Sequence, residues 1–164
     1  MSLKNNPFIN RPKHKHGAVP FDDIKLEHFI PALDYAIAEA EKNLEFIKNN
    51  PESPTFDNTA LQIESGTELM DAVANTYFNL MSAESDNKFK ELAQEISPKL
   101  SAFKNKVLLD SKLFKRVKTR YESRDKDGLT SEQKRLVEEK YKSQTFHDYQ
   151  WGLGMCPYSY CTAL

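Results

Sequence analysis

Residues 26–49 read LEHFIPALDYAIAEAEKNLEFIKN, and this stretch decides the fold. Its apolar residues recur in steps of three and four, namely Phe29, Ile30, Leu33, Ala36, Ile37, Ala40, Leu44 and Ile47. Because an α-helix makes one turn in about 3.6 residues, this spacing places those side chains on one face. The charged residues of the stretch fall mostly off that face. The pattern therefore predicts an amphipathic helix from Leu26 to Asn49.

The same period continues along the chain and predicts four further helices. They are expected at about residues 56–82 with Thr55 as N-cap, from Ser85 or Asp86 to about Val107, at about 111–122, and after the capping box Thr130–Gln133. Gly66 predicts a break or bend in the second helix, and Pro98 predicts a kink in the third. No segment alternates with period two for long, so we expect an all-α antiparallel bundle of about five helices.

The chain divides by composition into three regions. Residues 1–19 are rich in proline and basic residues and predict an extended arm, and residues 20–142 form the helical domain. Residues 143–164 contain no Lys, Arg or Glu, but they hold the single Trp and both cysteines. We expect this stretch to be an irregular, divergent tail, and we interpret it as out-of-frame translation or the product of a truncated gene.

Length and charge exclude several classes of function. The chain has 164 residues and a net charge of −1, so no overall field favours nucleic acid. No apolar run is long enough for a membrane span, and no signal peptide follows the start, which predicts a cytoplasmic protein without membrane partners. Charge is uneven, with net −11 in residues 21–96 and net +5 in residues 112–142. The two halves either neutralise each other or leave a basic face for an anionic partner.

Histidine and cysteine residues offer two weak metal-site candidates. His14 and His16 lie in the N-terminal arm, where a metal site competes with a solvated basic arm. Cys156 and Cys161 predict a disulfide, half of a metal site completed by His147, or an unspecialised tail with reduced thiols.

Acid–base candidates are equally weak, and no catalytic motif accompanies them. His28 is either a lone base or a residue that caps its helix. The pairs Glu41/Glu45 and Glu91/Glu95 can act as general acid and base only where burial separates their pKa values. The sequence contains no His-Glu-x-x-His zinc helix, phosphate-binding loop or nucleophile elbow. The residues alone therefore predict no catalytic or metal site in this chain.

An ordered set of short motifs resembles the N-terminal region of the thimet oligopeptidase family of zinc metallopeptidases, of the oligopeptidase A and peptidyl-dipeptidase type. The motifs are Pro20–Leu33, Asn50–Thr59, Glu64–Gly66, Phe78–Glu84, Ile96–Ser101, Leu113–Val117 and Leu129–Glu138. In that family this region is a helical wall beside a narrow channel that admits short peptides. The resemblance implies that the zinc ligands and catalytic residues lie far downstream, so no family catalytic residue maps onto this chain.

Three functions remain open at this stage. The first is a non-catalytic fragment of a zinc oligopeptidase, with zinc and short peptides expected for the full-length parent. The second is a stand-alone helical interaction module that exposes apolar helix faces or pairs them in a homo-oligomer. The third is a metal- or redox-active tail that uses His147, Cys156 and Cys161.

Overall fold

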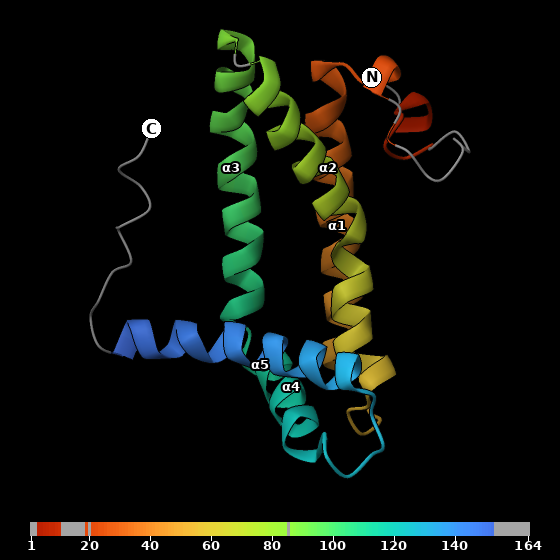
Figure 1. The fold of residues 1–164 in the computed structure, drawn as a ribbon, viewed down its shortest axis with the longest axis vertical. Coiled ribbons are helices and arrows are strands. Elements are labelled where there is room, and N and C mark those ends of the chain that lie inside the picture. Colours follow the sequence, from red (N-terminus) through yellow and green to blue (C-terminus); the bar gives the residue numbers. More distant parts are fainter. Residues whose placement is uncertain (1–2, 11–18, 20, 85, 153–164) are drawn as a thin grey trace. The chain divides into compact units, whose positions relative to one another are not determined.

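The computed structural model describes residues 3–10, 19, 21–84 and 86–152, without the side chains of Lys4, Glu84 and residues 146–152. Five α-helices follow one another: α1 (Phe29–Asn49), α2 (Gln62–Glu84), α3 (Asn87–Leu108), α4 (Ser111–Ser123) and α5 (Ser131–Gly152) (Figure 1). Short 3₁₀ segments precede α1, and a π-helical segment, η5 (Phe56–Leu61), precedes α2. The described residues contain no strand, so the all-α prediction is confirmed.

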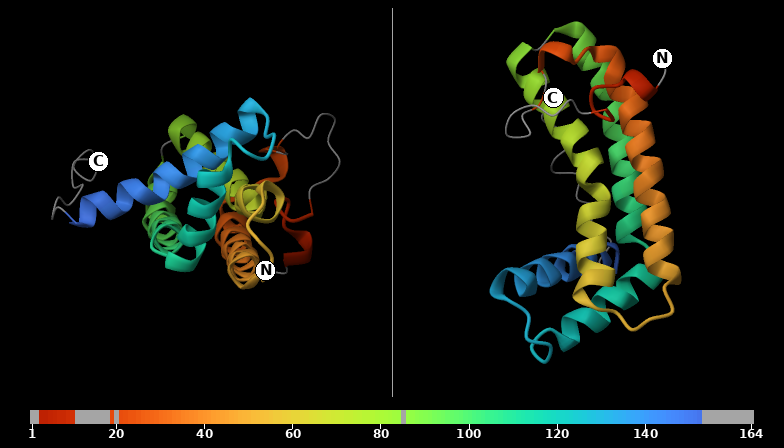
Figure 2. Two further views of the ribbon diagram at one scale, coloured as in Figure 1. Left: turned by 90° about the horizontal axis from the view of Figure 1, so that it is seen from below. Right: turned by 90° about the vertical axis from the view of Figure 1, so that its right-hand side faces the viewer.

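The chain forms two compact units. Unit 1 consists of Met1–Phe46 and Ile63–Phe103, and unit 2 consists of Ile47–Gln62 and Lys104–Leu164. In unit 1, α1, α2 and α3 run alongside one another with alternating direction, as the ribbons in Figures 1 and 2 show. This is the antiparallel arrangement that short connections between helices favour.

Aromatic side chains form the centre of unit 1. The ring of Tyr77 lies 5.3 Å from Phe29 in an edge-on arrangement and 6.1 Å from Phe89, and Phe29 in turn lies 5.2 Å from Phe8. The Tyr77 hydroxyl donates a hydrogen bond to the Phe89 carbonyl. The predicted apolar stripe of α1 is buried around these rings, with Leu33 fully excluded from solvent. Such rings add edge-on contacts to the burial of a large apolar area.

The first residues pack against this core over part of the predicted extended arm. Leu3–Asn5 form a 3₁₀ turn, and Asn6 and Phe8 are buried. The Asn6 amide donates to the His28 carbonyl at 2.8 Å, which ties the segment to the start of α1. The prediction of an extended arm is therefore wrong for residues 3–10, because a buried ring and a buried amide hold them. His14 and His16 lie outside the described residues.

Gly66 has a role other than the predicted break. It lies inside the unbroken helix α2, and a Cβ atom built on it would fall 2.1 Å from the Asn43 side-chain nitrogen of α1. The glycine thus permits a close approach of the two helices. Helix α3 continues through Pro98 as one element, and the kink expected there stays a prediction.

Unit 2 is built from α4, α5 and η5, which pack on one another. The predicted caps are present: the Asn58 backbone N–H donates to Thr55 Oγ1 at 3.0 Å, and Gln133 and Thr130 form their reciprocal pair. Asp110 caps α4 by accepting from the backbone N–H groups of Lys112 and Leu113, each at 3.0 Å. Such caps satisfy helix donors that have no partner within the helix.

Helix α5 continues ten residues into the stretch that we expected to be irregular, and ends at Gly152. Its interior contains no Gly or Pro, and the Gln144 amide donates to the Val107 carbonyl at 3.2 Å. The prediction overlooked that a sequence without breakers stays helical even when its apolar period fades. The His147 side chain, Cys156 and Cys161 lie outside the described residues, so their readings stay predictions.

Candidate functional site

His28, the base candidate near the first helix, is committed to a structural role. Its Nδ1 accepts a hydrogen bond from the Lys25 backbone N–H at 3.0 Å, and the side chain is buried. This contact closes the short 3₁₀ turn Leu26–His28 before α1. The capping interpretation of His28 is therefore confirmed.

The paired carboxylates lie on helix surfaces. Glu91 and Glu95 are both exposed on α3, and Glu45 is exposed on α1 beside the half-buried Glu41. The exposed carboxyl groups lack the burial that would separate the pKa values of a general acid and a general base. Within the described residues, no three His, Cys, Asp or Glu side chains gather so as to hold a metal ion.

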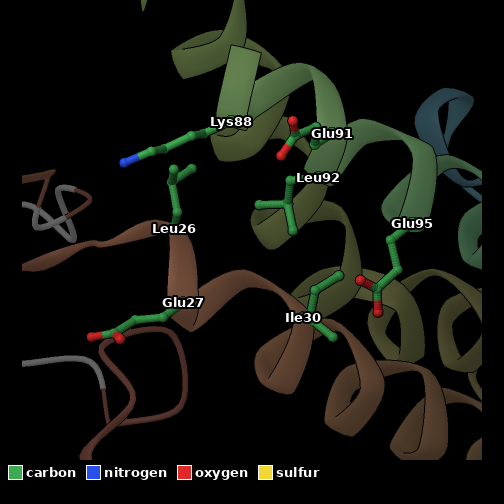
Figure 3. Close-up of a pocket in the computed structure, with 7 residues that line it drawn as sticks. All are labelled: Leu26, Glu27, Ile30, Lys88, Glu91, Leu92 and Glu95. Carbon is green, nitrogen blue, oxygen red and sulfur yellow. The ribbon is translucent and has the colours of Figure 1, made fainter. Parts of the chain in front are cut away.

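A groove between the start of α1 and the start of α3 collects the most distinctive side chains of unit 1. We call it the α1–α3 groove, with a volume of about 370 Å³. Figure 3 shows Leu26, Glu27 and Ile30 on one side and Lys88, Glu91, Leu92 and Glu95 on the other. The three apolar side chains are half-buried and form its floor, while the charged side chains are exposed at its rim. The groove thus combines an apolar base with an acidic edge.

Among the described residues, few ion pairs involve the carboxylates of that acidic edge. Glu95 lies 3.8 Å from the Lys99 ammonium, which pairs more closely with Asp34 at 2.6 Å. The hydrogen bond that the Lys99 ammonium donates to Asp34 is the main cause that raises the pKa of Lys99 above its ordinary value. Glu27 and Glu91 form no ion pair within the described part of the chain.

The residues of this groove were only partly visible in the sequence. The spacing pointed to Glu91 and Glu95, but as a pair on one helix rather than as the edge of a groove. What the sequence did not show is that Leu92 lies beside Leu26 and Ile30, which are distant from it along the chain. No local period reports which helix a half-buried leucine will face.

A second cavity of about 560 Å³ lies elsewhere in unit 1. Its lining mixes apolar groups with two hydroxyls and one carboxylate, from Phe8, Ile9, Asn10, Tyr35, Ser65, Glu68 and Leu69. It contains no histidine or cysteine and offers no catalytic pair.

Part of the basic segment 112–142 is paired with acids of the same segment. Arg120 pairs with Asp127, Lys134 with Asp125 at 3.0 Å, and Lys142 with Glu138 at 2.6 Å. Arg116 instead donates to the carbonyls of Asn50 and Glu52 and to the Asn58 amide oxygen. These contacts involve only part of the segment's basic side chains, so both interpretations of its net charge of +5 stay predictions.

None of the described helices combines the length and the apolar character that a bilayer span requires.

Comparison with known proteins places the chain beside bacterial peptidases. No protein-family model matches it. It is 32% identical over 136 residues to a dipeptidyl carboxypeptidase of Salmonella typhimurium, and 32% identical over 133 residues to a dipeptidyl carboxypeptidase of Escherichia coli. These matches cover 83% and 81% of this chain, but 20% of each relative. The chain thus spans about a fifth of the length of the curated relatives that it matches, and over that stretch it is similar to dipeptidyl carboxypeptidases, in agreement with the resemblance to the thimet oligopeptidase family that the sequence motifs indicate.

Proposed function

We propose that this chain is the non-catalytic N-terminal helical region of a zinc oligopeptidase whose full-length form hydrolyses short peptides. The observation that carries the proposal is the 32% identity to two dipeptidyl carboxypeptidases across most of this chain and a fifth of theirs. An all-α region with polar exposed faces fits a wall of such an enzyme. The catalytic chemistry is assigned to polypeptide that this chain does not contain.

Zinc does not fit the described residues of this chain. A catalytic zinc needs three protein ligands around an open position. The described part of the chain gathers no such set, His28 uses its Nδ1 for the Lys25 N–H, and the sequence has no His-Glu-x-x-His. We therefore assign zinc binding to residues of the longer parent and derive no step through a metal here.

A hydrolysis assay tests the non-catalytic part of the proposal. The purified chain is incubated with added zinc and internally quenched peptides, beside the Escherichia coli dipeptidyl carboxypeptidase as a positive control. We expect no cleavage by the chain above the rate in buffer. Zinc-dependent turnover that co-purifies with the chain and is abolished by a chelator would refute the proposal.

Complementation tests whether the chain can serve as a region of such an enzyme. The Escherichia coli dipeptidyl carboxypeptidase is expressed without its matched fifth, alone or together with this chain. We expect the chain to restore soluble protein or peptidase activity. Leu33→Asp is the matched control, because Leu33 is fully buried in unit 1 and a carboxylate there prevents folding. Equal results with the chain, the control and neither of them would count against the proposal.

Two exposed apolar side chains favour a second candidate, a helical interaction module. Phe46 is 66% exposed on α1, and Leu109, after α3, is 58% exposed. Large apolar groups at such exposure are candidates for contact with a partner or a second copy. Light scattering on the wild-type chain and on Phe46→Ser and Leu109→Ser tests this. A wild-type dimer that the substitutions dissociate supports the module, and a monomer at all concentrations excludes the homo-oligomer.

A further inference from the structure

We propose that the α1–α3 groove binds short peptides that carry a lysine or arginine beside an apolar side chain. The proposal rests on the proposed function for the choice of a peptide as ligand. It goes further in naming a binding site and a preference that come from this chain's own residues.

The floor of the groove supplies the apolar half of the site. Leu26, Ile30 and Leu92 are half-buried and converge from three elements, the 3₁₀ turn Leu26–His28, α1 and α3, as Figure 3 shows. An apolar side chain placed among them would remove further apolar surface from water on both partners. The volume of about 370 Å³ suits one or two amino-acid side chains rather than a folded domain.

The rim supplies the charged half of the site. The rim carries three carboxylates, those of Glu27, Glu91 and Glu95, and one cation, Lys88, whose ammonium extends away from Glu91 and Glu95 in Figure 3. Two other surface acids of the same unit are closely paired, Glu39 with Lys42 at 2.6 Å and Asp34 with Lys99. A cationic side chain beside the apolar anchor would therefore complement the rim, whereas an acidic one would be repelled.

Nuclear magnetic resonance titration of the intact chain tests the site directly. The probe is an acetylated and amidated tetrapeptide, Leu-Lys-Leu-Lys, with Leu-Glu-Leu-Glu and Ser-Lys-Ser-Lys as controls for charge and for the apolar anchor. We expect saturable shifts of backbone amides at residues 26–30 and 88–95 with the first peptide. The binding should weaken at about 1 M salt, where the screening length falls to about 3 Å. Both control peptides should bind at least about five times more weakly, because each lacks one half of the complementarity.

Substitutions on the rim separate this site from general attraction to an acidic protein. Glu91→Gln removes an exposed charge and should weaken binding of the Leu-Lys-Leu-Lys probe by about threefold, in the range found for exposed ion pairs. The double reversal Glu27→Lys/Glu91→Lys should weaken it by more than about tenfold. Asp71→Asn is the matched control, since Asp71 is an exposed acid of the same unit outside the groove. Circular dichroism of each variant verifies that the helices remain.

Several results would overturn the proposal. These are the absence of saturable shifts, shifts centred elsewhere, equal binding of the lysine and glutamate peptides, or an equal effect of Asp71→Asn. Concentration-dependent shifts of the groove without peptide would assign it to a second copy instead. Mass spectrometry of the recovered probe keeps the two proposals apart. A cleaved probe contradicts the non-catalytic assignment, whereas an intact probe that does not bind contradicts only the groove.

Discussion

The two units of the molecule differ in the kinds of side chain that their cores bury. Unit 1 centres on Phe8, Phe29, Tyr77 and Phe89, whose rings contact one another in a chain. Unit 2 also has an apolar core, which includes Leu113, Val117 and Val137, but it buries a charged side chain beside that core: Arg120 is 3% exposed. Apolar contacts tolerate small displacements, whereas buried polar groups need defined partners. Loss of one group should therefore act in different ways in the two units.

The largest effect is expected in the aromatic centre of unit 1. Phe29→Ala removes a ring that is 1% exposed and contacts both Phe8 and Tyr77. We expect the free energy of unfolding, measured in urea, to fall by about 3–5 kcal/mol, the cost of a large cavity in a core. Hydrogen exchange should show faster opening in α1, α2 and α3. A loss below about 1 kcal/mol would mean that the rings do not hold unit 1 together.

In unit 2, the outcome should depend on which partner is removed from the ion pair between the buried Arg120 and the exposed Asp127. Asp127→Ala leaves the Arg120 guanidinium buried with Ser123 as its remaining side-chain partner, and should cost about 2 kcal/mol. Arg120→Met removes the buried charge itself and should cost less than about 1 kcal/mol, since an apolar replacement needs no partner. Urea unfolding of both variants measures this asymmetry. Equal losses of unfolding free energy in Asp127→Ala and Arg120→Met would contradict this asymmetry.

Acid should weaken unit 2 through Asp110. Burial alone would raise the pKa of this carboxyl, but the Leu113 N–H, the Lys48 ammonium at 2.9 Å and the Lys112 N–H together lower it below its ordinary value. Because the pKa is lower in the folded state, the stabilisation is present above about pH 4 and is lost as the pH falls through the folded value.

The acid effect of Asp110 should amount to about 1 kcal/mol, the size of a typical N-cap. Urea titrations between neutral and acid pH measure it. Asp110→Asn keeps a capping oxygen without the charge, so it should flatten this part of the pH dependence, whereas Asp71→Asn should not. An unchanged slope in Asp110→Asn would contradict the assignment.

The smallest effect concerns the contact between α1 and α2. Gly66→Ala gains helix propensity of up to about 1 kcal/mol, but its new Cβ meets the Asn43 side chain. In the background Asn43→Ala that obstacle is absent, so adding Gly66→Ala should stabilise the chain by about 0.5–1 kcal/mol. Thermal unfolding of the wild type, the two single variants and the double variant gives the coupling free energy between positions 43 and 66. Equal effects of Gly66→Ala in both backgrounds would show that Asn43 rotates away without cost.

The sequence predicted what local chemistry decides. The apolar period located the helices, and Thr55, Asp86 and Thr130 illustrate why their starts were predictable: a short oxygen-bearing side chain precedes free backbone donors. The family resemblance also came from ordered local motifs. Helix α5 was underestimated, because its last residues are helical without an apolar stripe.

Features that depend on distant partners could not be predicted. The groove needs Leu26 and Leu92 to meet, and the burial of Arg120 needs Asp127 to fold back onto it. Gly66 looked like a breaker because its reason, Asn43, lies on another helix. The pattern within a helix reports its own faces, and which partner each face meets depends on tertiary packing.

The close approach at Gly66 also has an evolutionary consequence. Positions 43 and 66 share one small space, so related chains should vary there in a correlated way: a side chain at the second position requires a smaller or reoriented one at the first. A collection of relatives in which the two positions change independently would indicate a different spacing of these helices across the family. Correlated change would make this pair a marker for the register of α1 and α2 in members whose structures are unknown.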